Sequence, residues 1–236
     1  MNRFSIEAPF LLPSRPRPRL REGSAGRPIA ISLKESYGFL REVLRHPRAI
    51  GAIAQTSHRL AEALVQAADV ARSSDIIELG AGAGAITRWI LSVKPAQARV
   101  LAVERSPEYT SLLRERFPGL RVACGCVSQL GELAAAHDFP AADTVISALP
   151  WTNFSEAMQR DILSSVADLL VPGGVFTTIA CAGLHVTARG RNFRHLLERR
   201  FPTVEASPVI WRNLPPAFLY RCSGVAAQSP ADTDSA

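Results

Sequence analysis

The segment 76–87, with the sequence IIELGAGAGAIT, limits what this chain can fold into more than any other stretch. Its apolar start predicts a short buried strand over residues 75–79. Apolar residues at helical spacing predict a helix over 85–93, after the glycines. Because glycine has no Cβ, the backbone can turn sharply and approach a ligand closely, and a helix N-terminus adds unpaired N–H groups. The segment therefore predicts a site for a nucleotide cofactor.

Two glycine motifs fit this loop. The dinucleotide pattern G-x-G-x-x-A fits through Gly80, Gly82 and Ala85. The motif E-x-G-x-G-x-G, typical of S-adenosylmethionine (SAM) methyltransferases, fits through Glu78 and the glycines up to Gly84. A carboxylate at Glu78 would repel a pyrophosphate but could attract the cationic end of a methionine moiety, which favours the second motif. A glycine turn that only closes a βα unit is the structural alternative.

The positive charge of the chain is concentrated at its N-terminus. Residues 1–50 hold ten Lys or Arg and four Glu, a local charge of +6 that equals the net charge of the whole chain, so residues 51–236 sum to zero. This polarity suits an anionic surface, either lipid headgroups or nucleic acid. Proline and arginine predict a disordered basic arm over residues 1–29, with a solvated tail without a role as the alternative. Residues 224–236 predict a polar, disordered tail.

Residues 30–72 predict an N-terminal helical extension. Ser32 and Glu35 form a capping box for a first helix that ends before Pro47, and a second helix begins at Ser57. The first helix is amphipathic and basic, so it can lie in a membrane interface. Covering the core is the commoner use of such a stripe, and the two roles are compatible.

Beyond the glycine loop, the pattern continues as strands and helices in turn. Further strands are predicted over 99–104, 120–124, 142–147 and 174–180, followed by an antiparallel pair over 204–211 and 217–222. This order predicts an α/β, Rossmann-like domain over residues 30–223, with a seven-stranded, mostly parallel sheet and one antiparallel strand. A two-domain dehydrogenase would need a substrate domain, for which no length remains.

Two places along these strands carry candidate site residues. Glu104 ends its strand twenty residues after Gly84, where an acid can accept both ribose hydroxyls of a nucleoside. Trp151 and Phe154 follow the strand over 142–147, at the edge where open α/β sheets bind ligands. The alternatives are a surface glutamate and core packing of the aromatic rings.

The cysteines and the apolar runs exclude several classes of protein. Cys124, Cys126, Cys181 and Cys222 show neither zinc spacing nor a disulfide framework, which predicts no metal and a reducing cytoplasm. The first residues lack the apolar core of a signal peptide, and no segment predicts a transmembrane helix.

The glycine loop together with Glu104 resembles the class I SAM-dependent methyltransferases. Three further stretches are similar to bacterial phospholipid N-methyltransferases: HPRAIGAIA at 46–54, SALP at 147–150 and WRNLPPA at 211–217. The resemblance runs from about residue 33 to residue 222. It implies the class I fold, SAM as cofactor, and stepwise methylation of phosphatidylethanolamine toward phosphatidylcholine. The expected location is cytoplasmic, peripherally attached to the inner membrane face. Some similar proteins act on other aminolipids.

The resemblance also implies two sets of site residues. The cofactor set is Thr56, Ser57, Glu78, Gly80, Ala81, Gly82, Gly84, Glu104, Arg105, Cys126, Val127, Ser147 and Leu149. Related enzymes commonly carry an acid near position 126 for the adenine amino group, so here backbone groups could hold adenine while Val127 packs on its face. The acceptor set is Tyr37, Trp151, Phe154, Arg212 and Asn213. Tyr37 and His185 are the candidate bases, aromatic faces would stabilise a methylated cation, and Arg212 could hold a lipid phosphate.

The expected partners are an anionic membrane surface and an aminophospholipid, without a metal and without nucleic acid. RNA modification is the alternative, since ribosomal RNA adenine dimethylases share the glycine loop and an L-P-aromatic turn. Their turn begins with Asn, whose side chain orients the adenine amino group, whereas this chain has Ser147 there, which lacks that donor–acceptor pair. A non-catalytic protein that binds SAM or membrane is a third possibility.

Overall fold

Residues 57–213 and 215–224 are described by the structure, a computed structural model of the chain. In this part, seven strands form one sheet in the order β3-β2-β1-β4-β5-β7-β6. The strands are β1 (Asp75–Leu79), β2 (Arg99–Glu104), β3 (Arg121–Cys124), β4 (Ala142–Ser147), β5 (Leu170–Cys181), β6 (Thr203–Ala206) and β7 (Ala217–Ser223). Only β7 runs against its neighbours within this sheet. The predicted fold class is therefore confirmed, whereas the basic arm, the first amphipathic helix, Tyr37 and Thr56 lie outside the described residues.

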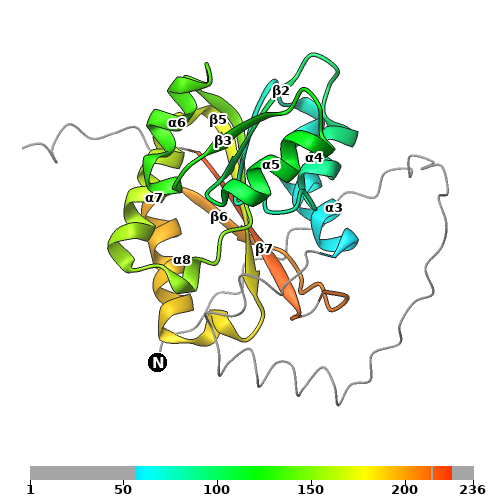
Figure 1. Cartoon of the computed structure of the whole chain (residues 1–236). Helices are drawn as coiled ribbons and strands as arrows, with labels where there is room; N and C mark the ends of the chain where they lie inside the picture. Colours follow the sequence, from blue (N-terminus) through cyan, green and yellow to red (C-terminus); the bar gives the residue numbers. More distant parts are fainter. Residues whose placement is uncertain (1–56, 214, 225–236) are drawn as a thin grey trace, which may run out of the picture.

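Helices cover both faces of the sheet, as Figure 1 shows. They are α3 (His58–Ala67), α4 (Thr87–Val93), α5 (Pro107–Arg116), α6 (Leu130–Ala136), α7 (Glu156–Leu169) and α8 (Ala188–Arg200), with short 3₁₀ turns η1 (Val70–Arg72), η2 (Val127–Gln129), η3 (Trp151–Asn153) and η4 (Leu184–Val186). Alternate residues of β1 point to opposite faces, so Ile77 packs with α6, α7 and α8. Ile76 packs on the other side with α3 and α4.

Side-chain caps fix where four helices begin. The hydroxyls of Ser57, Ser106, Ser155 and Thr187 each accept a backbone N–H from the first turn of α3, α5, α7 and α8, at 3.2–3.4 Å. Such a cap satisfies one of the N–H groups that a helix start leaves unpaired. Ser106, Ser155 and Thr187 therefore set where the chain turns into a helix after β2, β4 and β5, and Ser57 sets the start of α3.

Some element boundaries differ from the predicted ones. The helix predicted from residue 85 begins only at Thr87, because all three loop glycines have positive φ and prolong the turn. The strand predicted over 204–211 ends at Ala206, because Pro208 has no N–H for the ladder, and pairing resumes only as a single bridge between Ile210 and Ala217.

The sheet order places the ligand-binding edge. From β1 the chain proceeds outward to β2 and β3, then returns to β4 on the other side of β1. Open α/β sheets bind ligands at the carboxyl ends of the strands beside such a reversal. In the part of the chain that is described, no helix is long and apolar enough to cross a bilayer.

Candidate functional site

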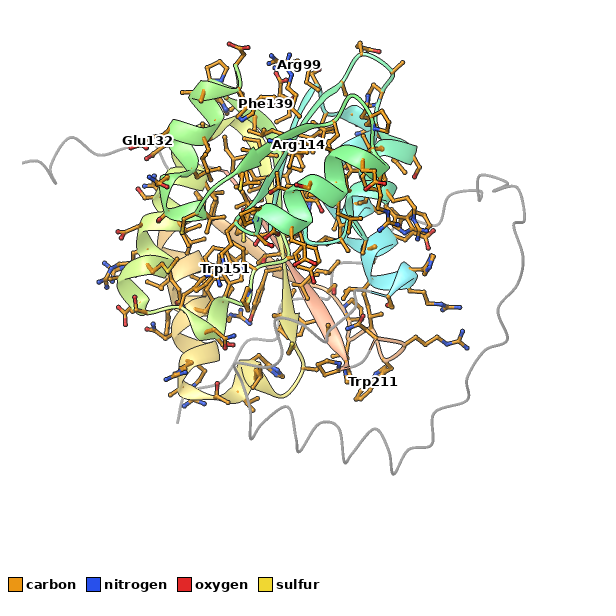
Figure 2. The ribbon with its side chains drawn as sticks, viewed as in Figure 1. Arg99, Arg114, Glu132, Phe139, Trp151 and Trp211 are labelled. Carbon is orange, nitrogen blue, oxygen red and sulfur yellow. The ribbon has the colours of Figure 1, made fainter. Side chains whose placement is uncertain are left out.

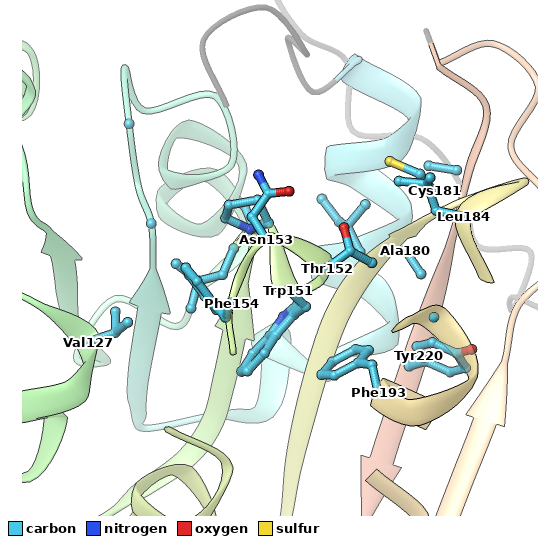
Figure 3. A pocket seen from close by; sticks show the side chains of 18 of the residues that line it. Val127, Trp151, Thr152, Asn153, Phe154, Ala180, Cys181, Leu184, Phe193 and Tyr220 are labelled. Atoms are coloured by element: carbon cyan, nitrogen blue, oxygen red, sulfur yellow. The ribbon is translucent and has the colours of Figure 1, made fainter. Parts of the chain in front are cut away.

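A cavity of about 850 Å³ lies at this edge of the sheet. Its volume is in the range expected for a small-molecule site. One half is bordered by the glycine loop and the ends of β2 and β3, and the other by residues 151–154, the end of β5, η4 and the start of β7. Figure 3 shows Val127 in the first half and the row Trp151, Phe193 and Tyr220 in the second. The two halves form one chamber that can hold a cofactor beside a second molecule.

Glu104 connects the glycine loop to the end of β2. Its Oε2 accepts the N–H of Gly82 and its Oε1 accepts the N–H of Ser106, both at 2.9 Å. The residue is 9% exposed and borders the cavity. Since each carboxylate oxygen has a second lone pair, Glu104 can still accept hydroxyl hydrogens from a bound nucleoside. The carboxylate thus shapes the loop as well as offering acceptors to a ligand.

The three glycines of the loop serve different purposes. Gly80 and Gly82 border the cavity, whereas Gly84 does not. A Cβ at Gly84 would lie 2.4 Å from Cε2 of Phe117, so this glycine is needed for packing against the end of α5. A Cβ at Gly82, with φ +53°, would meet no heavy atom within 4 Å. Of the three glycines predicted to approach the cofactor, only Gly80 and Gly82 are placed at the cavity.

Glu78 lies beneath the loop and away from the cavity. Its side chain is fully buried, its Oε2 accepts the hydroxyl of Thr87 at 2.6 Å, and its Oε1 has no partner among the described residues. Burial raises the pKa of Glu78 from 4.5 to about 7, against the opposing effect of the Thr87 hydrogen bond. The carboxyl group joins β1 to the first residue of α4, and Glu78, which the motif suggested for the methionine moiety, does not border the cavity.

Four other predicted residues do not border the cavity. The Ser57 hydroxyl caps α3, and the fully buried Ser147 hydroxyl accepts the N–H of Leu149 at 3.3 Å. Ala81 is buried in the cluster beneath α5, and Arg212 points into solvent at the turn before β7. Local hydrogen bonds and packing account for the first three positions.

The cofactor half of the chamber contains the remaining predicted cofactor residues, which follow the ends of β2, β3 and β4. Arg105, Cys126, Val127 and Leu149 all border it. A hydrogen bond from the Ser128 side chain is the main cause that lowers the pKa of the Cys126 thiol. Val127 is 7% exposed, so its side chain forms part of an apolar wall on which a planar base can pack.

Sequence reasoning missed two cavity residues at this end, Ser106 and Tyr109. They occupy the cap and the first turn of α5, where the chain leaves Glu104. Tyr109 is 40% exposed. The sequence did carry a signal for Tyr109, because it closely follows Glu104, the acid that ends β2. A residue in that turn must lie at the same edge of the sheet as Glu104 and the glycine loop.

Trp151 combines the two roles that the sequence left open. It is 3% exposed, and its Nε1 donates to the Thr178 hydroxyl at 2.8 Å. Its ring stacks on Phe193, with centroids 4.7 Å apart, and has Phe154 and Phe176 at its edges. Trp151 therefore belongs to the core and at the same time forms a wall of the chamber.

Phe193 and Tyr220 complete this aromatic wall and were not predicted. Phe193 comes from α8 and Tyr220 from β7, and their ring centroids are 6.3 Å apart. Tyr220 is 3% exposed, and burial raises its pKa, so its phenol stays protonated and can only donate or accept a hydrogen bond. Neither residue stands in a sequence motif, so only the three-dimensional structure connects them with Trp151.

His185 and Asn213 both border the chamber. Nδ1 of His185 accepts the N–H of Gly183 at 3.2 Å, which places the proton of the neutral ring on Nε2. A base needs a lone pair, so His185 could accept a proton only after losing this contact. Asn213 accepts the N–H of Ser57 at 2.9 Å and donates to the carbonyl of Pro215 at 2.8 Å, which fixes the start of α3 against β7.

Comparisons with known proteins agree with this geometry. The family described as "Methyltransferase domain" matches residues 76–174. The chain is 33% identical over 198 residues to the ornithine lipid N-methyltransferase of Singulisphaera acidiphila, covering 82% of this chain and 98% of that protein. It is 41% identical over 85 residues to a probable ribosomal RNA small subunit methyltransferase A of Halobacterium salinarum, covering 36% of this chain and 29% of that protein.

The fold has counterparts among solved structures. The O-methyltransferase from Bacillus cereus in complex with S-adenosylhomocysteine superposes with a TM-score of 0.59 at 16% identity, over 79% of this chain and 90% of that one. The matched methyltransferase domain and the lipid N-methyltransferase relative identify SAM as the cofactor. This chain therefore belongs to the bacterial lipid N-methyltransferases, a family of class I SAM-dependent enzymes.

Proposed function

We propose that this enzyme transfers methyl groups from SAM to the free amine of a membrane aminolipid, with ornithine lipid as the first acceptor to test. The observation that carries the proposal is the single chamber in which the cofactor half, around Gly82 and Glu104, opens directly onto an aromatic half. The similarity to an ornithine lipid N-methyltransferase along nearly its whole length supports the choice of acceptor.

The chamber suits methyl transfer to nitrogen by proximity. When bound, SAM supplies an electrophilic methyl group on a sulfonium. The chain then has to hold an amine lone pair in line with that methyl group and keep water away, and alignment of this kind can account for much of the rate. The buried wall of Trp151, Phe193 and Tyr220 excludes water from this position.

Aromatic rings also suit the product. Each transfer makes the nitrogen a more permanent cation, and such a cation is attracted to the face of an aromatic ring. One face of Trp151 is covered by Phe193, so Phe154 and Tyr220 are the better candidates for this contact. The amine must lose its proton before it attacks. Tyr220 is protonated and the Nδ1 lone pair of His185 is engaged, so we propose that an ionised acidic group of the lipid itself accepts the proton.

Phosphatidylethanolamine is the second acceptor, supported by the three motifs similar to phospholipid N-methyltransferases. We place the reaction at the inner membrane surface, to which the basic residues 1–50 would attract the protein. RNA is a weaker candidate. The similarity to a ribosomal RNA methyltransferase covers 29% of that protein, and Ser147 is buried instead of offering its side chain to an acceptor.

The test uses the purified full chain, labelled SAM and three acceptors in parallel. Ornithine lipid and phosphatidylethanolamine are each presented in vesicles that contain phosphatidylglycerol, and unmodified ribosomal RNA is offered alone. We expect label in a lipid, resolved by mass spectrometry into mono-, di- and trimethylated headgroups. Label in phosphatidylethanolamine alone would move the substrate to the second acceptor. Label in RNA alone would overturn the proposal.

A further inference from the structure

The exposed large apolar side chains of the described residues gather at one edge of the molecule. They are Tyr109, Val186 and Trp211, exposed by 40%, 59% and 76%. Tyr109 borders the chamber, Val186 follows the bordering His185, and Trp211 precedes the bordering Asn213 by two residues. Figure 2 shows Trp211 at the periphery, in contrast to Trp151 inside. Exposed apolar groups concentrated around one opening mark an interaction surface.

Val186 and Trp211 lie on two segments that are held together. The N–H of Ala182 donates to the carbonyl of Pro216 at 2.8 Å, and the rings of His185 and Phe218 meet edge to face with centroids 5.2 Å apart. The segment 182–192 therefore begins beside the start of β7, which the turn 207–213 precedes. A guanidinium hydrogen bond from Arg191 to the carbonyl of Val186 holds η4 in place. We call these two segments, 182–192 and 207–213, the rim.

The rim is basic although the rest of the chain beyond residue 50 is not. It carries Arg189, Arg191 and Arg212 and no Asp or Glu, whereas residues 51–236 sum to zero charge. All three arginines are exposed. On the side toward α7, the carboxylate of Glu156 accepts a hydrogen bond from Asn192 of the rim at 3.1 Å.

We propose that the rim docks on an anionic lipid bilayer, with Trp211 and Val186 inserted between headgroups and the arginines paired with lipid phosphates. Tryptophan and arginine both favour this layer, because one end of each side chain is apolar and the other is polar or charged. The inference rests on the proposed function in one respect: docking by the rim turns the mouth of the chamber toward the lipid headgroups. Trp211 and Val186 do not border the chamber, so their role is in docking and not in the reaction.

Fluorescence quenching tests the insertion directly. Trp211 is the most exposed of the three tryptophans, since Trp151 is 3% exposed and Trp89 is half-buried. In vesicles of phosphatidylglycerol and brominated phosphatidylcholine, we expect strong quenching for the wild-type chain and most of it lost in Trp211→Phe, a change that keeps an apolar ring. Equal quenching in the two proteins would overturn the proposal.

Vesicle flotation supplies the second test. Loss of Arg212 in Arg212→Ala should weaken binding about fivefold, equivalent to the ~1 kcal/mol that a basic residue contributes at an anionic leaflet. Trp211→Asp and Val186→Asp should weaken it by on the order of tenfold, since each removes insertion of an apolar group. The matched control is Arg72→Ala, which should bind vesicles like wild type. Arg72 is an exposed arginine before the N-terminal end of β1, whereas the chamber and the rim lie at the carboxyl ends of the strands. Wild-type binding by Trp211→Asp would refute docking by the rim.

Two controls separate docking from folding and from catalysis. The affinity for SAM and the methylation of a detergent-dispersed acceptor should not change in Trp211→Asp and Val186→Asp. Vesicle binding that depends on Trp211, without methylation of either lipid by the wild type, would refute the proposed function and leave the docking surface standing. If an RNA oligonucleotide displaces the vesicles and its own binding depends on Trp211, the rim is a nucleic-acid interface and the lipid proposal falls.

Discussion

Gly84 and Gly82 allow the clearest test of the site architecture, because the same substitution should affect stability at one and ligand binding at the other. Residue 84 has a backbone φ of +85°, and the Cβ that Gly84→Ala adds would lie 2.4 Å from Phe117 and 3.1 Å from Leu113. The left-handed conformation costs about 1–2 kcal/mol and overpacking adds about 1–3 kcal/mol, so we expect about 2–5 kcal/mol of destabilisation. The expected loss is a large part of the free energy of unfolding, which is about 5–15 kcal/mol for a folded domain.

Gly82→Ala is the matched control. Its φ of +53° is within the allowed left-handed region, and its Cβ meets no heavy atom within 4 Å. Only the conformational cost of about 1–2 kcal/mol should appear in the free energy of unfolding. Because Gly82 borders the cavity, the added methyl group should instead lower the affinity for SAM.

Urea unfolding and calorimetry separate these effects. The shift of the urea midpoint at constant slope gives the change in the free energy of unfolding, and titration of the folded protein with SAM gives the affinity. Phe117→Leu should relieve the clash. The double variant Gly84→Ala with Phe117→Leu should therefore lose less free energy of unfolding than the sum of the losses in the two single variants. A cost below about 1 kcal/mol for Gly84→Ala, or a larger cost for Gly82→Ala than for Gly84→Ala, would refute the division of roles between the glycines.

Three further predictions concern ionisable residues. Glu104→Ala should lose about 1.5–3 kcal/mol of SAM affinity in calorimetry. Glu108→Ala, which removes an exposed carboxylate on the following helix α5, should leave the affinity unchanged, and wild-type affinity in Glu104→Ala would remove Glu104 from the site. Because the pKa of Glu78 rises from 4.5 to about 7 on folding, unfolding experiments should show stability falling as pH rises between these values, by on the order of 3 kcal/mol, and Glu78→Gln should flatten that slope. Iodoacetamide should label Cys126, whose pKa is lowered, faster than the buried Cys222, whose pKa is raised, and SAM should protect Cys126; labelling that ignores SAM would place Cys126 outside the site.

Features carried by local sequence could be predicted. The strands around the glycine loop and the position of Glu104 depend on spacing within a few tens of residues, and both are present as expected, with Glu104 at the end of β2 beside the loop. A motif does not say which side of the loop each atom faces. Glu78 and Gly84 fit the motif as well as Gly82 does, but packing under α4 and α5 turns them away from the chamber.

Features that depend on pairing between distant segments could not be predicted. Tyr220 enters the chamber because β7 pairs with β5 in the register that places it opposite Thr178, whose hydroxyl holds Trp151. A shift of one residue would turn the Tyr220 side chain to the other face of the sheet. The alternating pattern of the last strands predicted their existence, but it carried no information about this register.

The position of Ser147 bears on which acceptor the chamber can orient. An enzyme that holds a planar amino group through the first side chain of this turn needs that side chain in the cavity. Here the Ser147 hydroxyl is fully buried and holds the N–H of Leu149, and the Ser147 carbonyl accepts the Thr178 hydroxyl at 3.2 Å. The turn is thus committed to joining β4 to β5 and to positioning Trp151. Under the proposed function, the acceptor amine is oriented by the aromatic wall, which can attract a cationic headgroup by its charge and shape.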